Sequence, residues 1–200
     1  GPAHPLGRNA LRAVHAQAAT LDHFDPLVGP EFATRYEFFF RLLRENESHQ
    51  ERLSAIESDE LYHHWGLTQL LIEESKSKRA GNPSYAKELA ELALRTAELL
   101  DPAFYHPKWV ADLCAVATVT LAEAHLALED FDGAKRHLRV ATRWQLDGTH
   151  RPRIARAIAT LRVRILWELG QQDEEVDRLL EDVNLIERQD NSDEGNLVSW

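Results

Sequence analysis

The sequence predicts an all-α fold, and three observations support that prediction. Leu and Ala dominate the apolar residues, whereas runs of β-branched residues, which favour strands, are nearly absent. Apolar residues recur at three- and four-residue spacing over long stretches, which is the period of an amphipathic helix. Gly and Pro gather mainly in short clusters that separate these stretches. We therefore expect antiparallel helical hairpins joined by turns.

The N-terminal region is expected to contain two helices. Apolar spacing predicts the first over Asn9–Leu21 and the second over Phe32–Asn46. Two prolines and a glycine break the pattern between them, in His23–Pro30. Ser48–Ser58 reads as a weak continuation of the second helix.

The middle of the chain predicts three further helices. The first covers Glu60–Ser77 and ends at the polar stretch 78–83. Ser84 can cap the next helix, Tyr85–Leu100, because Ser is a preferred residue at a helix start. Pro107–Leu128 forms the longest helix, with proline in its first turn, where the missing N–H is not needed.

The C-terminal part continues the same pattern. A helix over Asp132–Trp144 is followed by a loop over Gln145–Pro152 and a helix over Arg153–Leu169. Pro152 marks the start of that helix, as Pro107 does for the longest one. Gly170 is placed to close that helix, and Asp173–Arg188 forms the last one. The residues from 189 to the end are polar and predict a frayed tail.

The stretch Leu121–Trp144 carries the clearest signature: the end of one helix, a tight acidic turn and a second amphipathic helix. Its large apolar residue, its small residues at set offsets and its aromatic residue in the turn resemble the tetratricopeptide repeat (TPR) of bacterial-type proteins. The matching residues are Leu121, Ala122, Ala124, Phe131, Ala134 and Ala141, with Ala90 and Ala97 at the corresponding packing positions of the preceding repeat. The resemblance implies a short α-solenoid of stacked hairpins, with alanine where helix axes cross.

The resemblance divides the chain into three parts. Residues 59–188 would hold about three TPR-like repeats. Residues 1–58 would cap or extend the solenoid, and residues 189–200 would form the polar tail. The opening Gly1-Pro2 looks like a protease-cleavage scar, so we interpret the sequence as a piece of a larger protein.

Composition restricts the classes of function. The net charge of −10 argues against a nucleic-acid binder overall. The single cysteine, Cys114, excludes an internal disulfide and favours a reducing compartment, so we expect a cytoplasmic protein. No stretch approaches roughly 18 uninterrupted apolar residues, and we therefore expect no membrane span.

No motif predicts catalysis, a cofactor or a metal. The sequence has no HExxH, no possible CxxC, no GxSxG and no phosphate-binding glycine loop. His63 and His64 are adjacent and would point apart on a helix, so the histidines are interpreted as surface or packing residues. Cys114 lies in an apolar run and reads as a small buried residue. We therefore expect a non-catalytic protein without cofactors.

The charge layout is the most unusual feature. Between Lys135 and Arg164 lie nine basic residues and one acidic residue, whereas Glu168–Glu194 holds eleven acids and two arginines. In one interpretation the arginines pair with the acidic last helix, and each exposed pair contributes about 0–1 kcal/mol. In the other, some arginines face the groove that first helices line in such solenoids and receive carboxylates of a peptide.

These observations predict a protein–protein interaction module of TPR type, which binds a peptide or another domain of its parent protein. An acidic segment would suit its arginines. The alternative is a regulatory or sensory domain of a bacterial signalling protein or transcriptional regulator. In the central repeat the groove would be formed near Val116, Val119, Glu123, Leu126 and Ala127. The candidate partner-binding residues are Arg153, Arg156, Thr160, Arg164, Trp167 and Glu123.

Overall fold

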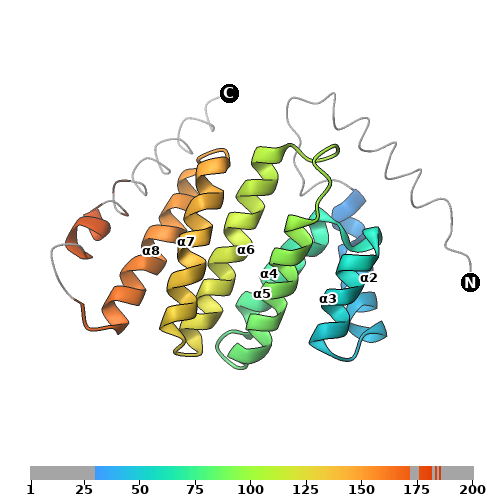
Figure 1. Cartoon of the computed structure of the whole chain (residues 1–200), viewed down its shortest axis with the longest axis horizontal. Helices are drawn as coiled ribbons and strands as arrows, with labels where there is room; N and C mark the ends of the chain where they lie inside the picture. Colours follow the sequence, from blue (N-terminus) through green and yellow to red (C-terminus); the bar gives the residue numbers. More distant parts are fainter. Residues whose placement is uncertain (1–29, 172–175, 182, 184, 186–200) are drawn as a thin grey trace, which may run out of the picture.

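The computed structural model describes residues 30–171, 176–181, 183 and 185. All regular secondary structure in this part of the chain is helical, as the sequence predicts (Figure 1). The predicted helix Asn9–Leu21 and the polar tail lie outside it, as does half of the predicted helix Asp173–Arg188. In chain order the elements are α2 (Pro30–Glu45), α3 (His49–Ser58), a short 3₁₀ helix η1 (Glu60–Tyr62), α4 (Trp65–Lys78), α5 (Pro83–Glu98), α6 (Pro107–Ala127), α7 (Phe131–Asp147) and α8 (Pro152–Glu168).

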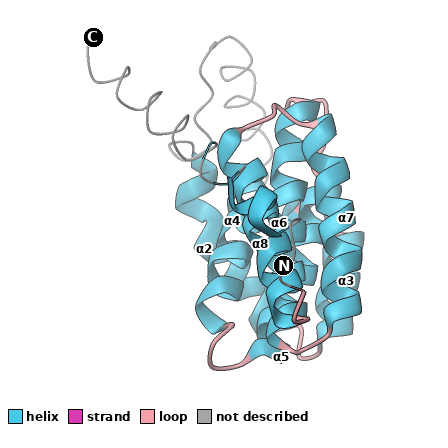
Figure 2. Ribbon diagram, turned by 90° about the vertical axis from the view of Figure 1, so that its left-hand side faces the viewer, coloured by secondary structure: helices cyan, strands magenta, loops and turns pink. Residues whose placement is uncertain are grey.

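From α4 onward, helices that follow one another in the chain lie side by side and alternate in direction (Figure 1). The pairs α4/α5 and α6/α7 have the most extensive packing, and α5 also packs on α6 (Figure 1). The odd- and even-numbered helices form two layers, because α4 contacts both α2 and α6, and α6 contacts α8, while α3 lies against α5. Figure 2 shows the same helices from the side, turned by 90° from the view of Figure 1. The layer formed by α4, α6 and α8 positions the groove described below.

Local signals explain where most helices begin and end. Pro107 and Pro152 occupy the first turns of α6 and α8, as the sequence predicts. After α8 the backbone of Gly170 has a positive φ of 71°, a conformation that glycine adopts without steric cost. The cap of α5 was predicted at Ser84, which is wrong. Asn82 holds that position and accepts the Tyr85 N–H at 3.1 Å, with Pro83 already in the first turn.

Residues 48–58 form a separate helix rather than a continuation of α2. The Ser48 side chain accepts the Glu51 N–H at 3.2 Å, and the Glu51 carboxylate accepts the Ser48 N–H at 2.9 Å. This reciprocal arrangement is a capping box, which starts a new helix at His49. The Ser48 N–H lowers the pKa of the Glu51 carboxyl group, and the Ser48 side chain and the Glu47 N–H lower it further.

The helix predicted over Glu60–Ser77 is interrupted. Asp59 accepts the Leu61 N–H and starts the 3₁₀ turn η1, and His63 and His64 then leave the helical conformation. The buried His64 ring accepts the Leu67 N–H at 3.3 Å and so caps α4. The prediction that His63 and His64 share a helix is therefore wrong, because side-chain capping divides the segment.

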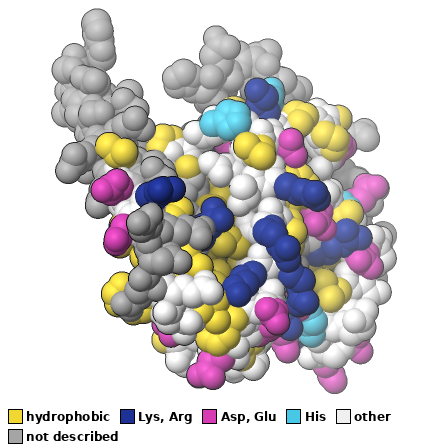
Figure 3. Space-filling view, turned by 60° about the vertical axis from the view of Figure 1, so that its left-hand side comes forward, with side chains coloured by type: hydrophobic (Ala, Val, Ile, Leu, Met, Phe, Trp, Pro, Cys, Tyr) yellow, Lys and Arg dark blue, Asp and Glu magenta, His cyan; other side chains and the backbone are white. Residues whose placement is uncertain are grey.

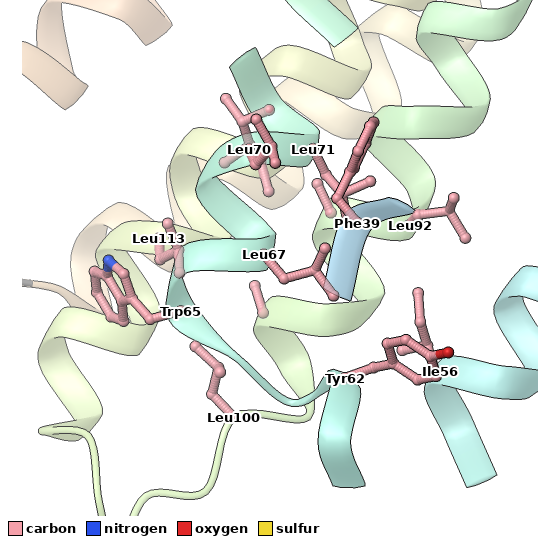
Figure 4. Packing of buried hydrophobic residues seen from close by; sticks show 14 of the residues in the cluster. Phe39, Ile56, Tyr62, Trp65, Leu67, Leu70, Leu71, Leu92, Leu100 and Leu113 are labelled. Carbon is pink, nitrogen blue, oxygen red and sulfur yellow. The ribbon is translucent and has the colours of Figure 1, made fainter. Parts of the chain in front are cut away.

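Two clusters of buried apolar residues form the core. The larger joins α2, α4, α5 and α6 and includes Leu67, Leu92 and Leu113 (Figure 4). The smaller joins α6, α7 and α8 around Leu161 and Ile165. The residues of the TPR resemblance lie in these interiors: Phe131 is half-buried, and Leu121, Ala122, Ala124, Ala134, Ala141, Ala90 and Ala97 are buried.

Helix α6 carries most of the apolar character of the interior. Judged only by length and composition, it is the single described helix that could cross a membrane. In the fold, 78% of its apolar window is covered by neighbouring helices, which is typical of a core helix.

Candidate functional site

A hollow of about 350 Å³ lies on the layer of α4, α6 and α8, and we call it the α4–α6–α8 groove. Its residues come from three helices far apart in the sequence and from the turn before α8. Apolar and aromatic side chains supply its walls, with charged and amide groups between them. The lining residues are Trp65, Gln69, Ile72, Glu73, Lys76, Trp109, Asp112, Leu113, Val116, Arg151, Arg153 and Ile154.

Helical spacing brings these side chains together. On α4, Trp65, Gln69 and Ile72 follow one another at intervals of three or four residues and so share one face. On α6, Trp109 and Val116 are two turns apart and lie on the face that meets α4. The groove is therefore built on the faces of rigid helices rather than on loops.

A buried carboxylate ties one end of the groove. Asp112 on α6 is 6% exposed and accepts the Thr149 N–H at 3.0 Å and the Thr149 hydroxyl at 2.5 Å. The Arg151 guanidinium lies 3.5 Å from the same carboxylate. A Cβ at Gly148 would collide with this carboxylate, so the close approach of the turn requires glycine. Asp112 thus holds the α7–α8 turn, and the start of α8, against α6.

A second carboxylate links α6 to its neighbours two turns beyond Val116. Glu123, near the end of α6, forms an ion pair with Arg79, which follows α4. Arg164 on α8 lies 3.7 Å from the other oxygen of Glu123. The Glu123 side chain therefore links α6 to the segment after α4 and to α8. The two arginines compensate its negative charge.

Two buried polar atoms of the groove have no partner. Among the described residues, neither the indole Nε1 of Trp65 nor the amide Oε1 of Gln69 makes a hydrogen bond, and both atoms are shielded from solvent. Trp65 is 7% exposed and lies beside Leu113 at the edge of the larger cluster (Figure 4). Buried donors and acceptors are nearly always paired, so this donor and this acceptor, one turn apart, require an explanation.

A second hollow, of about 720 Å³, lies between α7 and α8 and is named here the α7–α8 seam. Lys and Arg side chains gather among hydrophobic ones on this side of the molecule (Figure 3). Asp132 is the one acid among the described residues that line the seam. The others are Lys135, Arg136, Leu138, Arg139, Thr142, Ile158, Arg162, Ile165 and Leu166.

The structure brings together some of the predicted partner-binding residues. Arg153 lines the α4–α6–α8 groove, and Glu123 and Arg164 form an ion pair between α6 and α8 without lining it. Thr160 and Trp167 are exposed on α8, and Arg156 is half-buried; none of the three is among the described residues that line either hollow. Their role in binding stays a prediction.

The predicted groove positions of α6 were only partly those that line the hollow. Val116 lines it, whereas Val119 and Leu126 are buried in the smaller cluster. Trp65, Gln69, Trp109 and Asp112 were not among the predicted site residues. Continuing the same face of α6 back by two turns from Val116 reaches Asp112 and Trp109, and that spacing was the available signal.

His125 and Cys114 serve the fold. The buried His125 ring lies 2.8 Å from Asp130, whose carboxylate also accepts the Gly133 N–H at 2.8 Å, and these two contacts lower the pKa of Asp130. Burial raises the pKa of the Cys114 thiol to about 12, which keeps it protonated and unreactive. In the described part of the chain, no group of three or more His, Cys, Asp or Glu side chains is placed to hold a metal ion.

Comparisons with known proteins found no match to this chain. No protein-family model matches it, and neither does any curated protein or solved structure.

Proposed function

We propose that this protein is a non-catalytic protein–protein interaction module, and that the α4–α6–α8 groove binds a peptide segment of a partner or of its parent protein. The TPR resemblance of residues 121–144 supports the proposal, and in that reading the antiparallel pairs α4/α5 and α6/α7 stack as a short solenoid. The observation that carries the proposal is the groove itself, in which Ile72, Trp109 and Val116 form apolar walls beside charged and amide side chains.

The composition of the groove suits a peptide. Trp109, Ile72 and Val116 offer apolar contact area, and large aromatic side chains are the residues that contribute most at interfaces. The Asp112 carboxylate holds Thr149 and Arg151 at one end of the groove and so fixes its shape there. Few polar atoms among apolar walls is the usual composition of a binding site.

The experiment is a selection from a random-peptide phage library on the immobilised protein. Gln69→Arg places a long side chain in the groove, and Thr142→Arg places the same side chain at the α7–α8 seam, as the matched control. Thermal unfolding first establishes that both variants are folded. We expect enriched clones to bind the wild type and Thr142→Arg but not Gln69→Arg.

Two results would count against the proposal. Clones lost on Thr142→Arg and kept on Gln69→Arg would place recognition in the seam instead of the groove. No enrichment above an unrelated helical protein would indicate that the module does not bind peptides. A regulatory domain of a signalling protein or transcriptional regulator would use the same groove for its ligand, so that alternative function meets the same test.

A further inference from the structure

We propose that the α7–α8 seam binds a small amphipathic anion, a molecule in which an anionic head group such as a carboxylate is attached to an alkyl chain. The head group would lie among the basic side chains that line the seam, and the chain would lie on the apolar side chains between them. This site is separate from the α4–α6–α8 groove, so the inference does not depend on peptide binding there.

The side chains that line the seam carry a surplus of positive charge. Lys135, Arg136 and Arg139 come from one face of α7, at spacings of three and four residues. Arg162 faces the same hollow from α8, and Asp132 is the one acid among the described lining residues. In the part of the chain that the structure describes, the three basic residues of α7 form no ion pair. Cations that face one hollow repel one another, so an anion bound between them would be stabilised.

The floor of the seam is apolar. Leu138 of α7 lines it, and so do Ile158, Ile165 and Leu166 of α8. The two isoleucines are buried, whereas Leu138 and Leu166 are half-buried and leave apolar surface open to a ligand. Helix α7 packs less extensively on α8 than on α6, which leaves this space between α7 and α8. An alkyl chain placed here would lose its contact with water, and that loss is favourable.

The size of the seam suits a small molecule better than a partner helix. Its lining residues on α7 extend from Asp132 to Thr142, which is about 15 Å of helix. The volume of about 720 Å³ is within the range of ligand pockets. A helix of the same length, with its side chains, would occupy about 1,200 Å³ and could not be enclosed. An alkyl chain is narrower and can be covered along its length.

The test titrates small probes into the ¹⁵N-labelled protein. Octanoate and octyl phosphate carry an anionic head group on one alkyl chain, octylammonium carries a cationic head group on the same chain, and acetate has the charge without the chain. Backbone amide shifts report both the position of the probe and its dissociation constant. We expect both anions to shift the amides of Leu138, Thr142 and Leu166 and to bind about tenfold more tightly than octylammonium. Acetate should cause no comparable shift at the same concentration.

Two arginines of α7 provide matched variants. Arg139 lines the seam, whereas Arg143, which is one turn further along and also exposed, is not among its described lining residues. Arg139→Gln should weaken octanoate binding by about tenfold, which is the loss of about one charge-assisted hydrogen bond. Arg143→Gln removes the same charge from the protein and should change the affinity by less than about twofold. Thermal unfolding first establishes that both variants are folded.

Four results would overturn the inference. Octylammonium could bind as tightly as octanoate, acetate could cause the same shifts, the two arginine variants could weaken binding equally, or the alkyl anions could leave the amides of the seam unchanged. In the last case, shifts caused there by a helical peptide of repeated Glu-Glu-Leu-Leu would assign the seam to an acidic partner helix instead. The phage selection tests the α4–α6–α8 groove, so its outcome is independent of all four.

Discussion

The α4–α6–α8 groove and the α7–α8 seam lie on either side of the same helix, α8, yet differ in how their charges are handled. The groove is lined by the acids Glu73 and Asp112 and by the bases Lys76, Arg151 and Arg153. In the seam, four basic side chains surround an apolar floor with one acid. The charges of the groove are therefore nearly balanced, whereas the seam is a region where added negative charge is favourable.

The largest expected difference between the groove and the seam is the loss of stability when a leucine that lines each of them is shortened to alanine. Leu113 is buried in the larger cluster beneath the groove, so Leu113→Ala should lower the free energy of unfolding by about 2–5 kcal/mol. Leu138 is only half-buried beside the seam, and Leu138→Ala should cost about 1 kcal/mol. Urea unfolding measures both variants. Equal losses of unfolding free energy in the two variants would contradict this prediction.

The second prediction concerns the carboxylate at the end of the groove. Asp112→Ala leaves the Thr149 N–H without its acceptor and Arg151 without its partner, so stability should fall by about 1–3 kcal/mol. Asp132→Ala, at the exposed edge of the seam, is the matched control and should change stability by less than about 0.5 kcal/mol. Chemical unfolding of the two variants decides whether the acid of the groove is the structural one.

The third prediction is that the stability of the protein depends on pH through His137, which lies on α7. Burial lowers the pKa of His137, and the stacked His125 ring and Arg136 lower it further, against the opposing effects of Glu91 and Asp130. The unfolded chain then binds the proton more readily than the folded one. Stability should therefore decline as pH falls below about 6.5, with a slope of at most about 1.4 kcal/mol per pH unit for one proton.

His137→Phe tests this assignment, because it removes the titrating group and keeps a ring beside His125. Unfolding curves between neutral and mildly acidic pH should show a smaller decline in this variant. An unchanged decline would assign the dependence to other groups.

The smallest expected effect sharpens the electrostatic contrast. Thr142 is exposed at the seam beside Arg139, so Thr142→Glu should raise stability by up to about 0.5 kcal/mol at low salt. High salt should remove the gain, because exposed charges are screened. Thermal unfolding at two salt concentrations measures it. A loss of stability at low salt would contradict the view that the seam favours negative charge.

The helices were largely predictable, because their signals are local. Pro107 and Pro152 mark the starts of α6 and α8 as expected, and Gly170 follows α8 with the backbone that only glycine adopts easily. The divisions around Ser48 and His64 were not predicted, since they depend on side chains that bond to particular backbone N–H groups. Such side-chain caps end or start a helix without changing the spacing of its apolar residues, so that spacing does not reveal them.

The groove was less predictable than the helices that form it. The helix containing Trp65 was expected to begin at Glu60, and the face of that helix was not mapped. The pairing of Glu123 with Arg79 joins residues on different helices, which no spacing within one helix reveals. Whether Trp65 Nε1 and Gln69 Oε1 have hydrogen-bond partners depends on the side chains packed around them, so only the folded structure shows that they have none.

The most direct test of the account maps a bound peptide onto the two surfaces. Amide and indole chemical shifts of the labelled protein would be recorded with and without a peptide enriched in the phage selection. The account predicts that the largest changes fall on Trp65, Gln69 and Trp109, which line the α4–α6–α8 groove. Changes centred on Arg139 and Arg162 would place binding at the α7–α8 seam and contradict it.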